Sequence, residues 1–263
     1  SSIPDFDGIV SVAMKHGIVV IVDNTMATPY LFRPLDVGAN LVIHSTTKYL
    51  CGSSTVMGGA VVDLGNFDWT AGGRYPEFSE PDASYHGINF AETFKGTALA
   101  TRLRVKTMRD FGGTPSPFNS YLTLMGIQTL HLRMPRHVEN AQKVAAWLQT
   151  HPKVKSVSYP GLENHPQYEL AQKYFPKGPG GLFTFETQDY ESAQKVIESA
   201  KLCLHAANLG DVRTILTHPA STTHRQVNPE KLQSSGISRE MLRVSVGIED
   251  ADDIIEDLEQ ALR

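Results

Sequence analysis

Three short apolar runs, each followed at once by polar residues, constrain the fold of this chain more than any other feature. They lie at 18–22, 41–43 and 60–62. The first run consists of Ile and Val, which is typical of a parallel strand covered on both faces. Strands this short, separated by longer segments, indicate an open α/β sheet.

The segments around these runs have helical or loop character. Residues 6–15 carry apolar residues at helical spacing, and Gly17 is placed to cap the helix end. Residues 64–96 are rich in Gly, Pro and aromatic residues and predict a long structured loop. From Ser116, a predicted N-cap, to Gln149 the pattern is helical, and Pro135 must begin a new helix or kink an old one.

After residue 152 the sequence alternates between short apolar runs and helical stretches, which predicts a second, smaller α+β domain. Expected strands lie at 154–159, 182–186 and 242–246, and expected helices at 191–200 and 251–262. We place the boundary near Gly126. This divides the chain into residues 1–125, part of a larger domain, and residues 126–263, the smaller C-terminal domain.

Composition excludes several classes of protein. Of 263 residues, 41% are hydrophobic and 20% charged, and the formal charge is -4. These values are ordinary for a globular domain and show no electrostatic footprint for nucleic acid or anionic lipid. The two cysteines, Cys51 and Cys203, form no metal-binding spacing and favour a reducing, cytoplasmic setting. The apolar runs fall far short of a membrane span.

Reactive side chains follow two of the predicted strands. Asp23 ends the first, and Ser45, Thr47 and Lys48 follow the second. Ligands of open α/β sheets collect beyond the carboxyl ends of the strands, so these groups could bind an anion and activate an amine. The alternative for each residue alone is ordinary: caps for Asp23, Ser45 and Thr47, and a solvated charge for Lys48.

Four runs together carry a family resemblance. VDNT, HSTTKYL, HPASTTH and LRVSVGIED occur in this order along the chain. They resemble the pyridoxal-phosphate (PLP) enzymes of cysteine and methionine metabolism, and the resemblance covers essentially the whole chain. It implies PLP as cofactor and fold type I, the aspartate aminotransferase-like α/β architecture. A large-domain portion with a mainly parallel sheet would precede the smaller α+β domain.

Within that family, two further segments are similar to the O-acetylhomoserine sulfhydrylases. They are HAANLGD at 205–211 and the extended segment at 67–87. The resemblance implies a cytoplasmic homotetramer that converts O-acetylhomoserine and sulfide to homocysteine and acetate. A methionine or cystathionine γ-lyase remains an alternative, since γ-lyases and cystathionine γ-synthase share most of the motifs. A fold that binds a dinucleotide is disfavoured because no GxGxxG run is present.

The resemblance also assigns roles at the strand ends. Lys48 would carry PLP as a Schiff base and move protons, Asp23 would pair with the ring nitrogen, and Ser45 and Thr47 would reach the phosphate. Chemistry adds one requirement of its own: an amine that attacks an aldehyde must be neutral. The surroundings of Lys48 should therefore be partly desolvated or positively charged.

Substrate binding falls to three other residues. Arg243 would grip the α-carboxylate with its planar fork, and Asn208 and Thr223 would help to hold it. Asn208 departs from the serine usual in the γ-lyases. For Arg243 the alternative is a salt bridge at the edge of the core.

Two histidines and a cysteine near these motifs are expected to be structural. His218 and His224 are six residues apart without a nearby acidic partner, which is a poor zinc spacing. Cys51 has no evident base, so a packed small residue is expected, not a nucleophile.

The family pattern also includes an N-terminal portion with a glycine-rich phosphate loop, and no such loop precedes Asp23. We therefore expect a fragment whose exposed sheet edge and apolar faces need a partner. A further alternative is a catalytically silent piece that serves only in assembly.

Overall fold

The first helix forms as its sequence predicts. The computed structural model describes residues 2–263, apart from the side chains at 229, 230 and 233, and its first element is α1 (Phe6–Lys15). The Asp5 carboxylate accepts a hydrogen bond from the Gly8 amide and caps the helix start. Gly17 has a φ of +60°, the left-handed conformation that suits the residue after a helix end.

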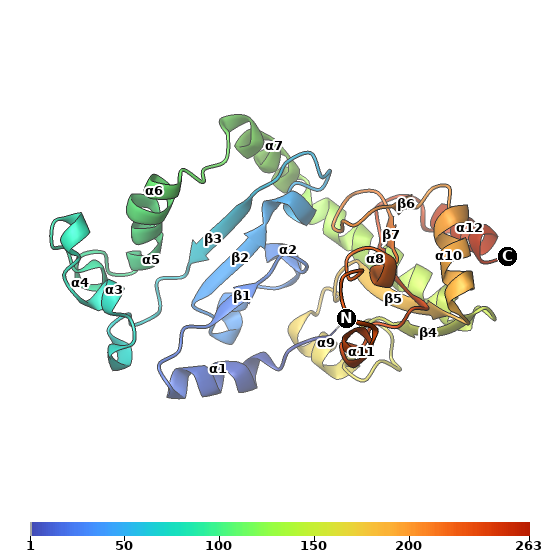
Figure 1. Cartoon of the computed structure of the whole chain (residues 1–263), viewed down its shortest axis with the longest axis horizontal. Coiled ribbons are helices and arrows are strands. Elements are labelled where there is room, and N and C mark those ends of the chain that lie inside the picture. The colour runs from blue at the N-terminus through green and yellow to red at the C-terminus, as the bar shows by residue number, and fades with distance from the viewer. Residues whose placement is uncertain (1) are drawn as a thin grey trace.

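Three strands make the first sheet: β1 (Ile21–Asp23), β2 (Leu41–Ser45) and β3 (Gly59–Asp63). They lie in the order β1-β2-β3 (Figure 1). β1 and β2 are parallel, but β3 runs antiparallel to β2. Half of the pairings in this sheet are thus parallel, where a mainly parallel sheet was expected.

One face of this sheet is open. Asp23, Ile43 and Val61 occupy one row across the three strands. All three are exposed, as is Ile21 two residues before Asp23. The prediction that the first apolar run, residues 18–22, is covered on both faces is therefore wrong at Ile21. An apolar run shows which surface a strand is suited to contact, but among residues 2–263 no segment covers this row of side chains.

Short helical turns connect the strands and build the long loop. α2 (Thr28–Leu31) and η1 (Pro34–Val37) follow β1, and η2 (Thr46–Leu50) follows β2. The predicted structured loop holds η3 (Ala71–Gly73), α3 (Pro76–Ser79), η4 (Ala83–Tyr85) and α4 (Phe90–Thr93). Its aromatic residues pack on the sheet, with Trp69 stacked on Phe78 at 4.2 Å between ring centroids. α5 (Ala98–Arg102), η5 (Leu103–Met108) and α6 (Arg109–Phe111) come next.

Two helices link the halves of the molecule in Figure 1. α7 (Pro117–Gln128) starts at Ser116, whose hydroxyl accepts from the Asn119 amide as predicted. α8 (Leu130–Thr150) follows after Thr129. Pro135 lies inside α8, six residues after Thr129, so the first of the two expected outcomes, the start of a new helix at Pro135, is wrong. The second outcome, a kink at Pro135, stays a prediction.

The second sheet has the order β4-β5-β8-β7-β6 and lies to the right of the first sheet in Figure 1. Its strands are β4 (Val154–Ser158), β5 (Leu182–Thr187), β6 (Leu204–His205), β7 (Ile215–Thr217) and β8 (Met241–Ser245). The β4, β5 and β8 strands confirm the prediction, whereas β6 and β7 are too short to stand out in the sequence. The remaining elements are α9 (Tyr168–Tyr174), α10 (Tyr190–Ser199), η6 (Pro219–Ser221), α11 (Pro229–Ser234) and α12 (Ala251–Leu262).

The main core joins this sheet to α8, α10 and α12. Fully buried Phe183, Leu216 and Leu242 face Leu148 from α8 and Leu258 from α12. Helices against sheets confirm the α/β class, and the division at Gly126 stays a prediction. Among residues 2–263, no helix combines the length and apolar character that crossing a membrane requires.

Candidate active site

The turn that carries Lys48 grows directly out of β2. Ser45 is the last residue of the strand and precedes η2, a single π-helical turn. Lys48 interrupts the helical geometry of that turn, with φ of -90° and ψ of -134°. The Thr47 hydroxyl bonds to the Gly58 backbone, accepting from its amide at 3.1 Å, and so ties the turn to the start of β3.

The Lys48 amine is partly buried among residues of the other half of the chain. Its Nζ donates a hydrogen bond to Oδ1 of Asn208. Burial, and then the positive charge of Arg243, lower the pKa of Lys48 below its usual 10.5. These are the two conditions that the chemistry of a neutral, nucleophilic amine requires.

Asn208 links three other groups. Its Nδ2 donates to the Ser54 hydroxyl at 2.8 Å, which fixes the amide so that Oδ1 faces Lys48. Its backbone carbonyl accepts from Arg243 at 2.9 Å. Gly210 keeps this approach open, since a Cβ there would lie 3.0 Å from the Lys48 Cβ.

Arg243 lies in the middle of β8, and its guanidinium is only partly used. Nη2 donates to the Asn208 carbonyl and, at 3.2 Å, to the Thr217 hydroxyl. The Nε atom is buried and has no hydrogen-bond partner among the described residues. Burial lowers the pKa of Arg243 below its ordinary value. The alternative of a salt bridge at the core edge finds no support, because none of the ion pairs within 2–263 includes Arg243.

Asp23 lies at the end of the neighbouring strand. Its Oδ1 accepts from the Thr25 amide at 3.0 Å, and the Thr25 hydroxyl accepts from the Ser45 amide at 2.8 Å. Thr25 therefore joins the ends of β1 and β2. The turn-capping alternative for Asp23 is seen directly, and it leaves the carboxylate exposed at the strand end.

Thr223 is not brought into this group. It is exposed, and its hydroxyl shares a 2.8 Å hydrogen bond with Nδ1 of the adjacent His224. Of the residues expected at the site, the structure thus joins Lys48, Asn208 and Arg243 by hydrogen bonds. Asp23, Ser45 and Thr47 lie at the edge of the first sheet.

The histidine and cysteine of the sequence motifs are packed side chains. His218 is buried, and its two ring nitrogens lie 2.7 Å from the Ser221 hydroxyl and from the Arg239 carbonyl. Cys51 is also buried. Burial opposes its thiolate, but hydroxyl and amide donors of Ser53 and Thr55 outweigh that effect and bring the pKa of Cys51 down to about 7.

Sequence reasoning missed three residues that organise the site: Thr25, Ser54 and Thr217. Thr25 carried a weak signal, because an Asp two residues before a Thr is a common turn pattern. Ser54 follows Lys48 by six residues but meets Asn208 only in the fold. Thr217 faces Arg243 through the antiparallel register of β7 and β8, which no local pattern reveals.

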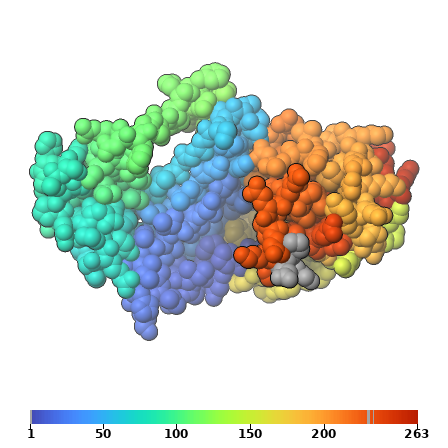
Figure 2. All heavy atoms as spheres, viewed as in Figure 1, coloured from blue at the N-terminus to red at the C-terminus, as the bar shows by residue number. Residues whose placement is uncertain are grey.

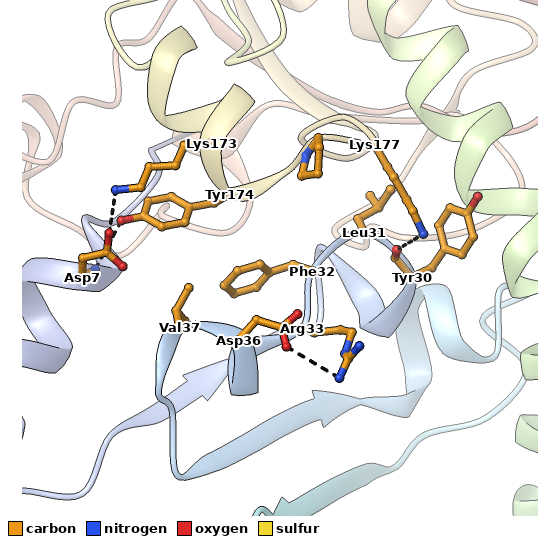
Figure 3. Close-up of a pocket in the computed structure, with 11 residues that line it drawn as sticks. Asp7, Tyr30, Leu31, Phe32, Arg33, Asp36, Val37, Lys173, Tyr174 and Lys177 are labelled. Atoms are coloured by element: carbon orange, nitrogen blue, oxygen red, sulfur yellow. Dashed lines mark hydrogen bonds and ion pairs between the residues drawn. The ribbon is translucent and has the colours of Figure 1, made fainter.

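A separate hollow of about 440 Å³ lies between α2, η1 and α9 (Figure 3). Its charged groups already have partners: Lys173 bonds to Asp7, and Arg33 to Asp36. Lys177 lies over the Tyr30 ring and donates to the Tyr30 carbonyl. None of its lining residues belongs to the group around Lys48, so this hollow is not part of the candidate site.

The residues around Lys48 fit a phosphorylated aldehyde and an amino-acid substrate. A lysine with a lowered pKa suits attack on the aldehyde, and the unpartnered Nε of buried Arg243 suits a carboxylate. An exposed carboxylate at the adjacent strand end, Asp23, suits a protonated ring nitrogen.

Relatives of known sequence support this interpretation. A homocysteine synthase of Schizosaccharomyces pombe is 46% identical over 264 residues, a match that includes 99% of this chain and 62% of the relative. An O-acetyl-L-homoserine sulfhydrylase 1 of Thermus thermophilus is 46% identical over 263 residues, with the same shares. The chain therefore spans about three fifths of the length of these curated relatives.

A solved structure shows the same fold. A Campylobacter jejuni protein described as an O-acetylhomoserine (thiol)-lyase superposes with a TM-score of 0.96 at 41% identity. The match includes 99% of this chain and 62% of that protein, whose crystal structure contains N'-pyridoxyl-lysine-5'-monophosphate. All of residues 1–263 match the family described as Cys/Met metabolism PLP-dependent enzyme. The chain belongs to that family.

Proposed function

We propose that the polypeptide containing residues 1–263 is a PLP-dependent O-acetylhomoserine sulfhydrylase, a transferase that makes homocysteine for methionine biosynthesis. One observation carries the proposal: the Lys48 amine, in the turn after β2, is bonded to Asn208, and burial together with the charge of Arg243 lowers its pKa. The names of the relatives, homocysteine synthase and O-acetyl-L-homoserine sulfhydrylase, support the choice of reaction.

PLP, when bound, supplies an aldehyde for the lysine and an electron-withdrawing ring for the substrate. Lys48 is the residue that bonds to it. We infer that Asp23 holds the ring nitrogen protonated from the end of β1. Ser45 and Thr47 contribute hydroxyls toward the phosphate. The Thr47 hydroxyl accepts from the Gly58 amide at 3.1 Å and donates to the Gly58 carbonyl at 3.4 Å, and that long second bond would give way to a phosphate oxygen.

We infer that Arg243 and Asn208 hold the substrate. Arg243 directs its unpartnered Nε toward the α-carboxylate, while Nη2 keeps its bonds to Asn208 and Thr217. Asn208 gives up its bond to the lysine when Lys48 engages other groups, and its amide then helps to hold the carboxylate. Thr223, which is exposed, would join only after its loop moves or another segment covers it.

The lowered pKa of Lys48 also suits proton transfer. Its amine would take the α-proton of O-acetylhomoserine, release it, and then take a β-proton as acetate leaves the γ-carbon. Hydrosulfide would add at the γ-carbon, and one proton would return to the β-carbon and one to the α-carbon, which gives homocysteine. We assign these transfers to the Lys48 nitrogen, whose side-chain partner in the structure, Asn208, does not titrate.

The test uses the full polypeptide that contains these residues, reconstituted with PLP. We expect borohydride reduction and peptide mapping to find pyridoxyl on Lys48, and Lys48→Ala to lose both that label and homocysteine formation. A label on another lysine, or full activity in Lys48→Ala, would refute the proposal. Release of α-keto acid and ammonia without homocysteine would instead identify a γ-lyase. Absence of any label would favour a silent assembly piece.

We further propose that the open apolar surfaces are covered in the complete protein. Phe111 and Phe118 are 86% and 67% exposed, and Figure 2 shows their segment standing away from the strands, with open space between. Further polypeptide or other copies of the chain, as in a homotetramer, would bury this surface and the open sheet face. Two buried free cysteines support a cytoplasmic location.

A further inference from the structure

Arg133 is a buried cation without a carboxylate partner among the described residues, and the one acidic group that acts on it is the Cys51 thiol. Arg133 lies in α8 and is 7% exposed. None of the ion pairs within 2–263 includes it. Its Nε donates to the Thr129 hydroxyl at 3.0 Å, one helical turn earlier. Burying a charge is costly unless hydrogen bonds compensate it, so the remaining contacts of this guanidinium explain why it is there.

Those contacts are backbone carbonyls of the turn that carries Lys48. Nη1 donates to the Tyr49 carbonyl at 2.9 Å, and Nη2 lies 3.5 Å from the Leu50 carbonyl. Nη2 also donates to the Gly126 carbonyl of α7 at 2.7 Å. One planar group therefore connects the two residues that follow Lys48 with the elbow between α7 and α8.

The backbone around the guanidinium approaches so closely that two positions beside it have room only for glycine. Gly52 has a φ of +83°, and a Cβ there would lie 2.5 Å from Nη1 of Arg133. At Gly126 a Cβ would lie 2.3 Å from the Cys51 carbonyl oxygen. The helices and the lysine turn thus meet backbone to backbone, with the guanidinium bridging them.

The geometry of the contacts demands an arginine. Three carbonyls and a hydroxyl accept from the three nitrogens of the planar guanidinium. An ammonium has its three donors on one atom and cannot reach all four acceptors. Carbonyls at the end of a helical turn carry partial negative charge, which favours a cation there.

We propose that Arg133 is a positioning residue, which fixes the turn of Lys48 and so places the amine opposite Asn208. This inference rests on the proposed function of Lys48. A catalytic group misplaced by about 1 Å can cost about 100-fold in rate. The contacts of Arg133 with these carbonyls, which we call the clamp, therefore act on catalysis although Arg133 touches neither substrate nor cofactor. The clamp also makes α8, in the second half of the chain, part of the support of a lysine in the first half.

The test compares Arg133→Lys with Arg136→Lys in the full polypeptide. Arg136 is a matched control one turn along α8, because its contacts are surface pairs with Glu139 and Asp250 and a 3.3 Å bond to the Glu249 carbonyl. In Arg133→Lys we expect kcat to fall about 10- to 100-fold with KM changed less than about threefold. The pH midpoint of the visible absorption of the lysine-bound cofactor should shift as well.

A second readout needs neither cofactor nor activity. The amides of Cys51 and Gly52 donate to the carbonyls of Thr46 and Lys48 at 3.1 and 2.8 Å, so their hydrogen exchange reports on the turn itself. We expect exchange to be faster in Arg133→Lys and unchanged in Arg136→Lys. Equal exchange, equal kcat and an unshifted pH midpoint in the two variants would overturn the inference.

Two further outcomes, a variant that does not fold and a failure of the proposed function, can be distinguished from a failure of this inference. If Arg133→Lys does not fold, Thr129→Val removes the acceptor of Nε, together with the 3.2 Å bond from that hydroxyl to the Gly126 carbonyl, and keeps the guanidinium. We expect smaller changes in the same direction; no change overturns the inference. If the unmodified protein shows no pyridoxyl on Lys48, the proposed function fails, whereas exchange at Cys51 and Gly52 still tests the clamp.

Discussion

The Lys48 amine donates a hydrogen bond to the side-chain oxygen of Asn208, although 160 positions separate the two residues in the chain. The contact joins the first sheet to the loop before β7. Its acceptor is neutral, and burial and then the cation of Arg243 lower the pKa of the amine. The pKa of Lys48 is therefore free to fall, as a nucleophilic amine requires.

Replacing Asn208 by Asp should reverse this effect. A carboxylate beside Lys48 favours the ammonium and raises its pKa. We expect the pH midpoint for the rate of PLP attachment, which lies below 10.5 in the unmodified protein, to move to higher pH. Asn208→Ser, which adds no charge, is the control. An Asn208→Asp midpoint equal to that of the control would contradict the role assigned to Arg243 and Asn208.

Ser54→Ala should loosen the Asn208 amide. Its Nδ2 would lose the 2.8 Å bond to the Ser54 hydroxyl, and because the pair is half-buried we expect the loss to cost about 1 kcal/mol. We expect a lower free energy of unfolding in urea and slower PLP attachment. Ser53→Ala is the matched control, because Ser53 is exposed and its hydroxyl contacts only Cys51 and Thr55 among the described residues. Identical behaviour of the two variants would count against the ordering role of Ser54.

Gly126→Ala should destabilise the protein although it lies inside α7. Alanine ordinarily stabilises a helix by about 1 kcal/mol relative to glycine. Here the added Cβ would lie 2.3 Å from the Cys51 carbonyl oxygen and 2.5 Å from that of Leu50, so the helix must move. We expect a loss of about 1–3 kcal/mol in urea unfolding. At Gly113 a Cβ meets no atom within 4 Å, so Gly113→Ala should leave stability unchanged; a stabilised Gly126→Ala would refute the close approach.

His137 should make stability fall in acid. Burial lowers its pKa to about 4 from 6.5, so between these values the unfolded chain binds a proton that the folded chain does not. The contribution of the neutral His137 ring to the free energy of unfolding is complete above pH 6.5 and is lost as the pH falls toward 4. The loss amounts to roughly 3 kcal/mol in total.

His137→Gln should reduce the pH slope of the unfolding free energy in that window. A share of the slope remains, since burial also lowers the pKa of His44 and His165. His131→Gln, exposed on the same helix, should keep the full slope. An unchanged slope in His137→Gln would show that this ring is protonated in the folded state.

Local sequence was sufficient for the longest helices, α1, α7, α8, α10 and α12. α1 and α7 begin at the capping residues Asp5 and Ser116, and α12 matches its expected range. Helix periodicity and caps act within a few residues, so they can be recognised without the fold. The antiparallel direction of β3 and the short β6 and β7 could not, because strand pairing depends on residues far apart in sequence.

The chain's own letters determined the reactive group and its family: a lysine after a strand in HSTTKYL, an aspartate after another in VDNT, and an arginine in LRVSVGIED. Only the tertiary structure decided that Asn208 meets Lys48, that Thr223 stays apart, and that Arg133 holds the lysine turn. The physical reason is how far apart in the sequence the interacting residues lie. Caps and periodicity are interactions between near neighbours, whereas desolvation of an amine and compensation of a buried cation depend on whatever the folded chain packs around them.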